Sequence, residues 1–198
     1  LLRDMGVGGA EIDVVCGRIP PAEKKNPFRE TGLFEGQELP EALLGAYSWC
    51  PTELLDAGFE IETLEHFEVG FDRKLHRIVY PIRDHQGVLI GLFGRVPDHL
   101  RVKMDPKYKP YQKEIEEEFP GYRLGSKRFL WNMHRVYPLA YRGELGQVVV
   151  VEGFKQLMWV WQSGYKEVVA LLGSHMTKPQ KYLLQRLGCP VILFLDGD

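Results

Sequence analysis

The stretch Val148-Val149-Val150-Val151-Glu152-Gly153-Phe154 decides the fold, together with Val191-Ile192-Leu193-Phe194-Leu195-Asp196-Gly197-Asp198 at the end of the sequence. Each is an apolar run that stops at a carboxylate. An unbroken apolar run is typical of a strand buried on both faces, as in parallel sheets. The carboxylates should therefore lie at the carboxyl edge of the sheet, where open α/β folds bind their ligands.

The residues between these two strands predict helix, strand and helix in turn. A helix over 154–163 should end at Gly164, a strand should cover 168–172, and Thr177 should cap a second helix that ends before Gly188. Strands that alternate with helices form parallel sheets through right-handed crossovers. This βαβαβ unit would bring Glu152 close to Asp196 and Asp198.

Three carboxylates at one sheet edge repel one another unless a cation lies between them. Mg²⁺ is the expected cation, because it prefers carboxylate oxygens and water. The sequence thus predicts a metal site built by Glu152, Asp196 and Asp198. The alternative is that these acids only cap loops.

The region before this unit has a mixed pattern. Two short helices are expected over 52–57 and 61–67, joined at Gly58. Strands over 75–83 and 88–93 should form an antiparallel hairpin around the turn at 84–87. Gly91 in the second strand and Gly94 just after it would let the backbone approach a ligand, or mark a bulge.

Several motifs resemble those of the DnaG-type bacterial and phage primases, in that family's order. Glu152-Gly153 and Asp196-Gly197-Asp198 look like the acidic motifs of the family's Toprim domain. The similarity also includes Leu54–Phe71, Tyr80–Val96, Asp105-Pro106-Lys107-Tyr108 and Ala170–Thr177, and it covers roughly Thr52 to Asp198.

The resemblance implies an α/β fold, in which an α+β N-terminal subdomain precedes a Toprim βαβαβ parallel-sheet unit that is truncated at its C-terminus. We expect an N-terminal arm or linker over residues 1–39, the mixed subdomain over 40–145 and the incomplete Toprim domain over 146–198. In the family this domain continues further, so the chain is expected to be a fragment that is weakly active or inactive alone.

The resemblance also implies a DNA primase core, a nucleotidyltransferase that makes short RNA primers on single-stranded DNA from ribonucleoside triphosphates. Glu152, Asp196 and Asp198 would be catalytic and hold Mg²⁺ or Mn²⁺. The residues that match the family's nucleotide- and template-binding positions are Arg95, Lys107, Tyr108, Lys127 and Arg128. A replicative helicase, fused or separate, would be a partner.

One departure from the family concerns the acidic motif itself. Gln156 stands where many bacterial primases have a further acid. This departure adds weight to one alternative function, a non-catalytic domain that binds DNA or a helicase. A second alternative is a Toprim nuclease that hydrolyses phosphodiesters with the same acids.

Charge is segregated along the chain. Residues 73–135 contain 14 basic and 7 acidic residues, whereas the rest contains 11 and 20. A basic region is the usual footprint of phosphate binding, although lysines can also serve only solubility. Aromatic residues within it could stack on single-stranded bases, or be core: Tyr108, Tyr111, Tyr122, Phe129 and Trp131.

The three cysteines, Cys16, Cys50 and Cys189, have no Cys-x-x-Cys spacing, so neither a disulfide framework nor a zinc site is expected within this chain. Reduced cysteines fit a cytoplasmic protein. The resemblance implies that this is the cytoplasm of a bacterium or a phage-infected cell. The sequence has no apolar run long enough for a membrane span.

Overall fold

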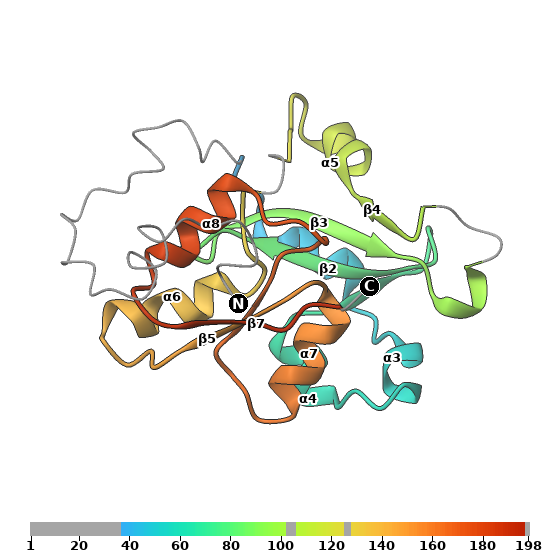
Figure 1. The fold of residues 1–198 in the computed structure, drawn as a ribbon. Coiled ribbons are helices and arrows are strands. Elements are labelled where there is room, and N and C mark those ends of the chain that lie inside the picture. Colours follow the sequence, from blue (N-terminus) through green and yellow to red (C-terminus); the bar gives the residue numbers. More distant parts are fainter. Residues whose placement is uncertain (1–36, 102–105, 125–127, 197–198) are drawn as a thin grey trace. The chain divides into compact units, whose positions relative to one another are not determined.

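A computed structural model describes residues 37–101, 106–124 and 128–196 (Figure 1). The chain divides into two compact units. The N-terminal unit comprises residues 36–83 and 88–124, and the C-terminal unit includes 84–87 and 125–198. The predicted domain limit between residues 145 and 146 lies inside the C-terminal unit, and the predicted arm over 1–39 lies almost wholly outside the described residues.

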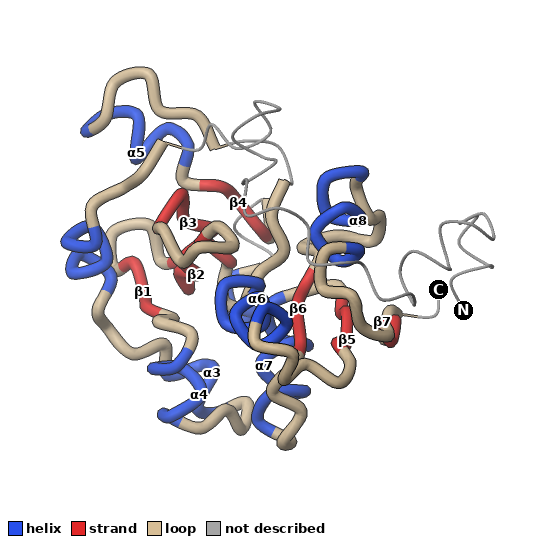
Figure 2. Tube along the Cα trace, turned by 90° about the vertical axis from the view of Figure 1, so that its left-hand side faces the viewer, coloured by secondary structure: helices blue, strands red, loops and turns tan. Residues whose placement is uncertain are grey.

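The C-terminal unit contains the predicted parallel sheet. Its strands are β5 (Val148–Val151), β6 (Val168–Ala170) and β7 (Val191–Leu193), in the order β6-β5-β7, and β5 pairs in parallel with both neighbours. Helix α7 (Phe154–Gln162) joins β5 to β6, and α8 (Lys178–Gln185) joins β6 to β7. The crossover from β5 to β6 and the crossover from β6 back past β5 to β7 run in opposite directions across the sheet. Because both are right-handed, α7 and α8 lie on opposite sides of it (Figures 1 and 2).

Local signals in the sequence explain the helix limits. Gly164, with φ +108°, follows α7 in a left-handed conformation that favours glycine. Thr177 caps α8 through a capping box with Gln180, as the sequence predicts for the cap. The buried Gln180 amide also donates to the carbonyls of Phe129 and Leu171, at 2.9 and 2.8 Å, and thereby ties α8 to the sheet.

Helix α6 (Met133–Tyr141) precedes the sheet and shares its core with α8. Asn132, at the start of α6, has φ +71° and donates through Nδ2 to the Val168 carbonyl at 2.9 Å. The buried core on this side contains Leu130, Met133, Val136, Val148, Val150, Val169, Leu171, Leu183, Leu184, Leu187 and Cys189. Strand β7 lies at one edge of the described sheet, where Ile192 and Phe194 are exposed.

The N-terminal unit is built on an antiparallel sheet of four strands in the order β1-β2-β3-β4. The strands are β1 (Gly70–Asp72), β2 (Arg77–Arg83), β3 (Leu89–Arg95) and β4 (Tyr108–Pro110). The helices are η1 (Glu41–Tyr47), α3 (Thr52–Asp56), α4 (Ile61–His66), η2 (Asp98–Leu100) and α5 (Gln112–Glu118). The predicted hairpin and both predicted short helices are confirmed, and Gly58 adopts φ +94° at the junction of α3 and α4.

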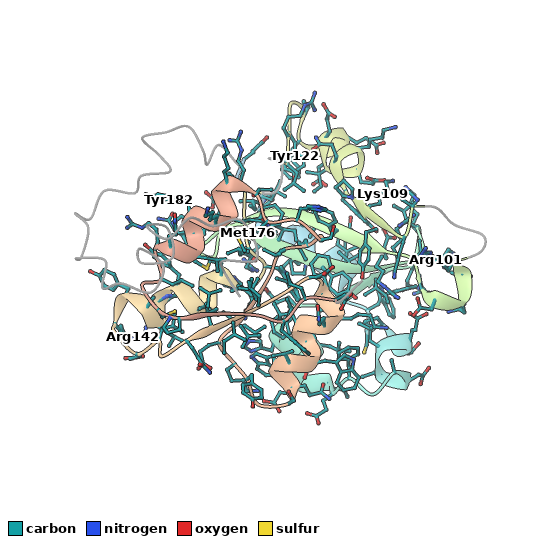
Figure 3. The ribbon with its side chains drawn as sticks, viewed as in Figure 1. Arg101, Lys109, Tyr122, Arg142, Met176 and Tyr182 are labelled. Atoms are coloured by element: carbon teal, nitrogen blue, oxygen red, sulfur yellow. The ribbon has the colours of Figure 1, made fainter. Side chains whose placement is uncertain are left out.

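The glycines of β3 make room for core side chains, and the expected irregularity lies beside Gly91, where the register of β2 with β3 shifts between Ile82 and Arg83. A Cβ at Gly91 would lie 2.6 Å from Leu124 Cδ1 and 2.8 Å from the Tyr122 hydroxyl oxygen, and one at Gly94 would collide with the Tyr111 ring. The buried Tyr122 hydroxyl donates to the Ile90 carbonyl at 2.7 Å (Figure 3). A side chain at either glycine would therefore displace tyrosines that belong to the core.

Arg83, at the end of β2, joins two carboxylates of the same unit. Its guanidinium donates to Glu41 and Glu68, each at 2.6 Å in the shortest contact, and its side chain is only 10% exposed. A guanidinium group that binds two carboxylates at once forms an ion-pair network, so Arg83 has a structural role here. None of the helices in the described ranges is long and apolar enough to cross a membrane.

Candidate active site

The carboxyl ends of β5 and β7 meet at one edge of the parallel sheet. The register pairs Val150 with Leu193, so the residues that follow the two strands leave the sheet at nearly the same level. One more backbone bond, from Phe194 N–H to the Val150 carbonyl at 2.8 Å, continues this pairing beyond β7. Glu152 and Asp196 are the acids that follow these strand ends.

These two acids are in direct contact. The Glu152 carboxylate accepts the backbone N–H of Asp196 at 3.0 Å. Glu152 is half-buried and Asp196 is exposed, so the pair faces solvent. The sequence-based expectation that strand pairing brings them together therefore agrees with the geometry, whereas Asp198 lies outside the described residues.

Gln156, in the first turn of α7, connects the same two strand ends. Its Oε1 accepts the backbone N–H of Glu152 at 2.9 Å, and its Nε2 donates to the Phe194 carbonyl at 3.2 Å. The same Nε2 lies 3.5 Å from Asp196 Oδ1. From the sequence, Gln156 stood out only because it replaces an acid of the family. Its contact with Glu152 could have been anticipated, because a glutamine in the first turn of a helix can accept the N–H of a residue just before that helix.

The loop after β6 borders this edge as well. Gly173 N–H donates to the Glu152 carbonyl at 3.1 Å, and Leu172 before it adopts φ +58°. His175 is exposed, and its Nδ1 lies 2.8 Å from the Ser174 hydroxyl oxygen. Among the described residues, the hydrogen bond recorded for the His175 ring is the one with Ser174, so the acid–histidine–nucleophile arrangement of a catalytic triad is not seen there.

Within the described ranges, no three His, Cys, Asp or Glu side chains form a group that could hold a metal ion. Two acids of the predicted triad are nevertheless adjacent, and both offer the hard oxygen ligands that Mg²⁺ and Mn²⁺ prefer. The donor set at this edge therefore fits such an ion. The metal-binding role of Glu152, Asp196 and Asp198 remains a prediction.

The predicted basic site residues differ in their surroundings. Arg95, on β3, has a side chain only 3% exposed and forms ion pairs with Glu53 at 3.2 Å and with Asp98. Lys107 is exposed, and its ammonium group lies 5.8 Å from the centre of the half-buried Tyr108 ring. Burial raises the pKa of Tyr108. Arg128 is half-buried in the C-terminal unit, and Lys127 lies outside the described residues.

The suggestion that interleaved aromatic residues stack on bases is wrong for four of the five. Tyr111, Tyr122, Phe129 and Trp131 are all buried, with at most 4% of each residue exposed. Tyr111 donates its hydroxyl to Asp72 at 2.8 Å, and Trp131 packs edge-on against Phe154. An aromatic side chain that lies in a core offers no face to a base. Of the labelled basic residues of the N-terminal unit, Arg101 is exposed, and Lys109 is half-buried and paired with Glu114 (Figure 3).

Comparison with known proteins defines the class of domain first. The family profile of the Toprim domain matches residues 146–198, the segment that contains β5, α7, β6, α8 and β7. The C-terminal unit thus contains a Toprim domain, with the Glu152–Asp196 pair at the carboxyl edge of its sheet.

The particular relatives are DNA primases. The DNA primase of Deinococcus radiodurans is 34% identical over 150 residues, which cover 74% of this chain and 23% of the relative. The DNA primase of Clostridium acetobutylicum is 30% identical over 149 residues, covering 74% and 22%. The chain is homologous to bacterial DNA primases, so the resemblance to the DnaG type is confirmed. It spans about a quarter or less of the length of the curated relatives it matches.

A solved structure shows the same fold. The RNA polymerase domain of Mycobacterium tuberculosis primase DnaG superimposes with a TM-score of 0.61 at 19% identity, over 79% of this chain and 64% of that one. The predicted α/β architecture, an antiparallel sheet followed by a parallel Toprim sheet, is therefore confirmed.

Proposed function

We propose that this chain is part of the RNA polymerase core of a DNA primase, which joins ribonucleotides into short primers on a single-stranded DNA template. The observation that carries the proposal is the contact between Glu152 and Asp196 at the carboxyl edge of a Toprim sheet. Homology to bacterial DNA primases supports it, as does the similar fold of a DnaG primase catalytic domain whose structure was solved bound to single-stranded DNA.

The proposed roles at the acidic edge follow from ligand chemistry. Glu152, Asp196 and Asp198 would hold Mg²⁺ or Mn²⁺, whose charge, when bound, neutralises phosphate oxygens and lowers the pKa of a coordinated hydroxyl. The chain itself supplies position: the Asp196 N–H fixes the Glu152 carboxylate, and Gln156 fixes the backbone from which it projects. Since phosphoryl transfer depends mostly on positioning and charge, such a fixed acidic edge suits it.

The proposed roles of the basic residues are less uniform than the motifs imply. Lys107 is the best candidate for a phosphate contact in the N-terminal unit, because it is exposed. Arg128 and Lys127 are proposed as further contacts to nucleotide or template phosphates, and Tyr108 as a neighbour of the Lys107 contact. Arg95 would reach a phosphate only by exchanging its partners Glu53 and Asp98, so we assign it first to holding η2 against the sheet.

The substrates would be ribonucleoside triphosphates, and a replicative helicase would be a partner in the bacterial cytoplasm or in a phage-infected cell. The relatives that support this setting are bacterial DNA primases.

The test compares primer synthesis by this chain with synthesis by a longer form that is extended to the length of the bacterial DNA primases. Each reaction contains labelled ribonucleoside triphosphates, a single-stranded template and Mg²⁺ or Mn²⁺. Template-dependent primers that disappear on chelation are the expected result for the longer form, whereas the chain alone should synthesise few primers or none. Metal-dependent cutting of DNA without triphosphates would instead support a Toprim nuclease. DNA binding without either reaction in both forms would support a non-catalytic domain.

A further inference from the structure

The side chain of Gln156 closes a ring of contacts at the acidic edge of the C-terminal unit. Its carbonyl oxygen holds the Glu152 backbone N–H at 2.9 Å, and its amide nitrogen holds the Phe194 carbonyl at 3.2 Å. The ring is completed by the 3.0 Å bond from the Asp196 N–H to the Glu152 carboxylate. The ends of β5 and β7 are thus joined twice, once through each side chain.

The chemistry of an amide fits this position better than that of an acid or an apolar group. The amide accepts from one strand end and donates to the other, and its donor lies 3.5 Å from Asp196 Oδ1. A carboxylate at position 156 could only accept, so it would face the Phe194 carbonyl and the Asp196 carboxylate as a third acceptor. An apolar side chain would leave both strand ends without these bonds.

The neutrality of Gln156 has a consequence for the two acids. Two carboxylates near each other repel, and a third charge at this distance would increase the repulsion in the absence of a cation. The amide instead lets the acidic edge keep its geometry without a bound ion. Partners that orient metal ligands in this way typically raise affinity, and their loss weakens it.

We propose that Gln156 is a positioning residue that holds Glu152 and Asp196 in place in the metal-free protein and thereby sets the affinity of this edge for a single divalent cation. The second part rests on the proposed function, because it requires these acids to be metal ligands. The first part depends only on the contacts of the metal-free chain.

The first test measures amide hydrogen exchange by NMR in the metal-free full chain. Gln156→Leu is expected to speed exchange at the backbone N–H groups of Glu152 and Asp196, because the first loses its acceptor and the second its fixed carboxylate. Gln162→Leu makes the same chemical change at the last residue of α7 and should leave the exchange of both amides unaltered. Unchanged exchange in Gln156→Leu would overturn the positioning role.

Gln156→Glu separates the two bonds, and it also guards against a Gln156→Leu variant that fails to fold. It keeps an acceptor for the Glu152 N–H but loses the donor to Phe194. The backbone N–H of Glu152 should therefore stay protected from exchange. The N–H of Asp196, two residues beyond Phe194, should exchange faster because the segment after β7 is held less firmly. Equal loss at both amides would contradict the assignment of one bond to each strand end.

The second test is titration with Mn²⁺, followed by electron paramagnetic resonance. Gln156→Leu should bind about 10- to 100-fold more weakly than the unaltered chain, as expected for loss of an outer-shell partner. Gln156→Glu should bind at least as tightly as the unaltered chain, because it adds a charge. Equal affinity of Gln156→Leu and Gln162→Leu would overturn the proposed effect on affinity.

The same titration separates this inference from the proposed function. If Glu152→Gln left Mn²⁺ binding unchanged, the acids would not be ligands and the metal site itself would be wrong. The exchange experiment would still decide the positioning role of Gln156, since it contains no metal. Binding that requires Glu152 but ignores Gln156 would overturn the inference alone.

Discussion

Asp196 donates its backbone N–H to the Glu152 carboxylate at 3.0 Å, although the two residues are 44 positions apart in the chain. The contact exists because β5 and β7 are parallel neighbours, and parallel neighbours end at the same edge. One oxygen of the Glu152 carboxylate is therefore used to hold the backbone at Asp196. The remaining carboxylate oxygens are available to a cation.

Glu152→Gln should abolish primer synthesis without unfolding the protein. Glutamine can still accept the Asp196 N–H, so the strand ends stay joined, but it lacks the charge that a divalent cation requires. We expect activity to fall by at least about a hundredfold, since a catalytic metal contributes several kcal/mol. Activity is measured by primer synthesis in the longer form, and folding by circular dichroism.

Glu167→Gln is the matched control for this change. Glu167 immediately precedes β6, at the amino end of that strand and therefore at the opposite edge of the sheet. It should retain activity. Retention of primer synthesis by Glu152→Gln as well would exclude a catalytic role for the Glu152–Asp196 edge.

The parallel sheet was predictable from sequence because its signals are local and agree with one another. Valine runs mark the strands, Gly164 and Thr177 mark helix limits, and alternation fixes the parallel order. Adjacent strand ends then imply adjacent acids. The same reasoning identified the hairpin of β2 and β3 from the turn between them.

Features that depend on tertiary packing were not predictable in this way. Tyr111 and Tyr122 lie in a basic stretch, but the close approach allowed by Gly91 and Gly94 turns them into core residues. Arg95 matches a basic motif position, yet one of its two acidic partners, Glu53, is 42 positions away. Sequence spacing carries no information on such distant pairing.

Single-stranded DNA should bind the full chain in a salt-dependent manner through Lys107 and Lys127. Each phosphate contact on a single strand contributes about −0.7 to the slope of log affinity against log salt, because counterions are released. The double change of both lysines to alanine should therefore flatten the slope by about 1.4. Fluorescence anisotropy over a range of salt concentrations measures it.

Lys166→Ala serves as the control, because Lys166 is exposed but lies outside the basic stretch, where its ammonium group sits 3.2 Å from the centre of the Trp161 ring. For Lys166→Ala, the slope of log affinity against log salt should match that of the unaltered chain. If the lysine pair leaves the slope unchanged, the path of the template does not include Lys107 and Lys127.

Gly91→Ala should destabilise the N-terminal unit. The new methyl group would collide with Leu124 and with the Tyr122 hydroxyl, whose bond to Ile90 would be strained or lost. Overpacking of this kind costs about 1–3 kcal/mol. Gly45→Ala, where no atom lies within 4 Å of the added carbon, should be nearly neutral. Equal urea midpoints for the two variants would refute the packing explanation for Gly91.

The stability of the C-terminal unit should decline in alkaline solution because of Cys189. This thiol is 4% exposed within the core shared by α6 and α8, and burial raises its pKa to about 11. An unfolded thiol ionises at a lower pH, near 9. Between pH 9 and 11 the unfolded state therefore binds fewer protons than the folded state, so the free energy of unfolding falls as pH rises.

The expected loss across this window is about 2 kcal/mol, from a pKa difference of about two units. Cys189→Ala removes the titrating group, so its unfolding free energy should depend less on pH between 9 and 11, although the lost side chain lowers stability at every pH. Cys50→Ala, which alters an exposed thiol, should keep the pH dependence of the unaltered chain. Urea unfolding at pH 8, 9, 10 and 11 compares the three proteins. Parallel curves for Cys189→Ala and Cys50→Ala would show that some other buried group, such as a tyrosine of the N-terminal unit, governs the alkaline loss.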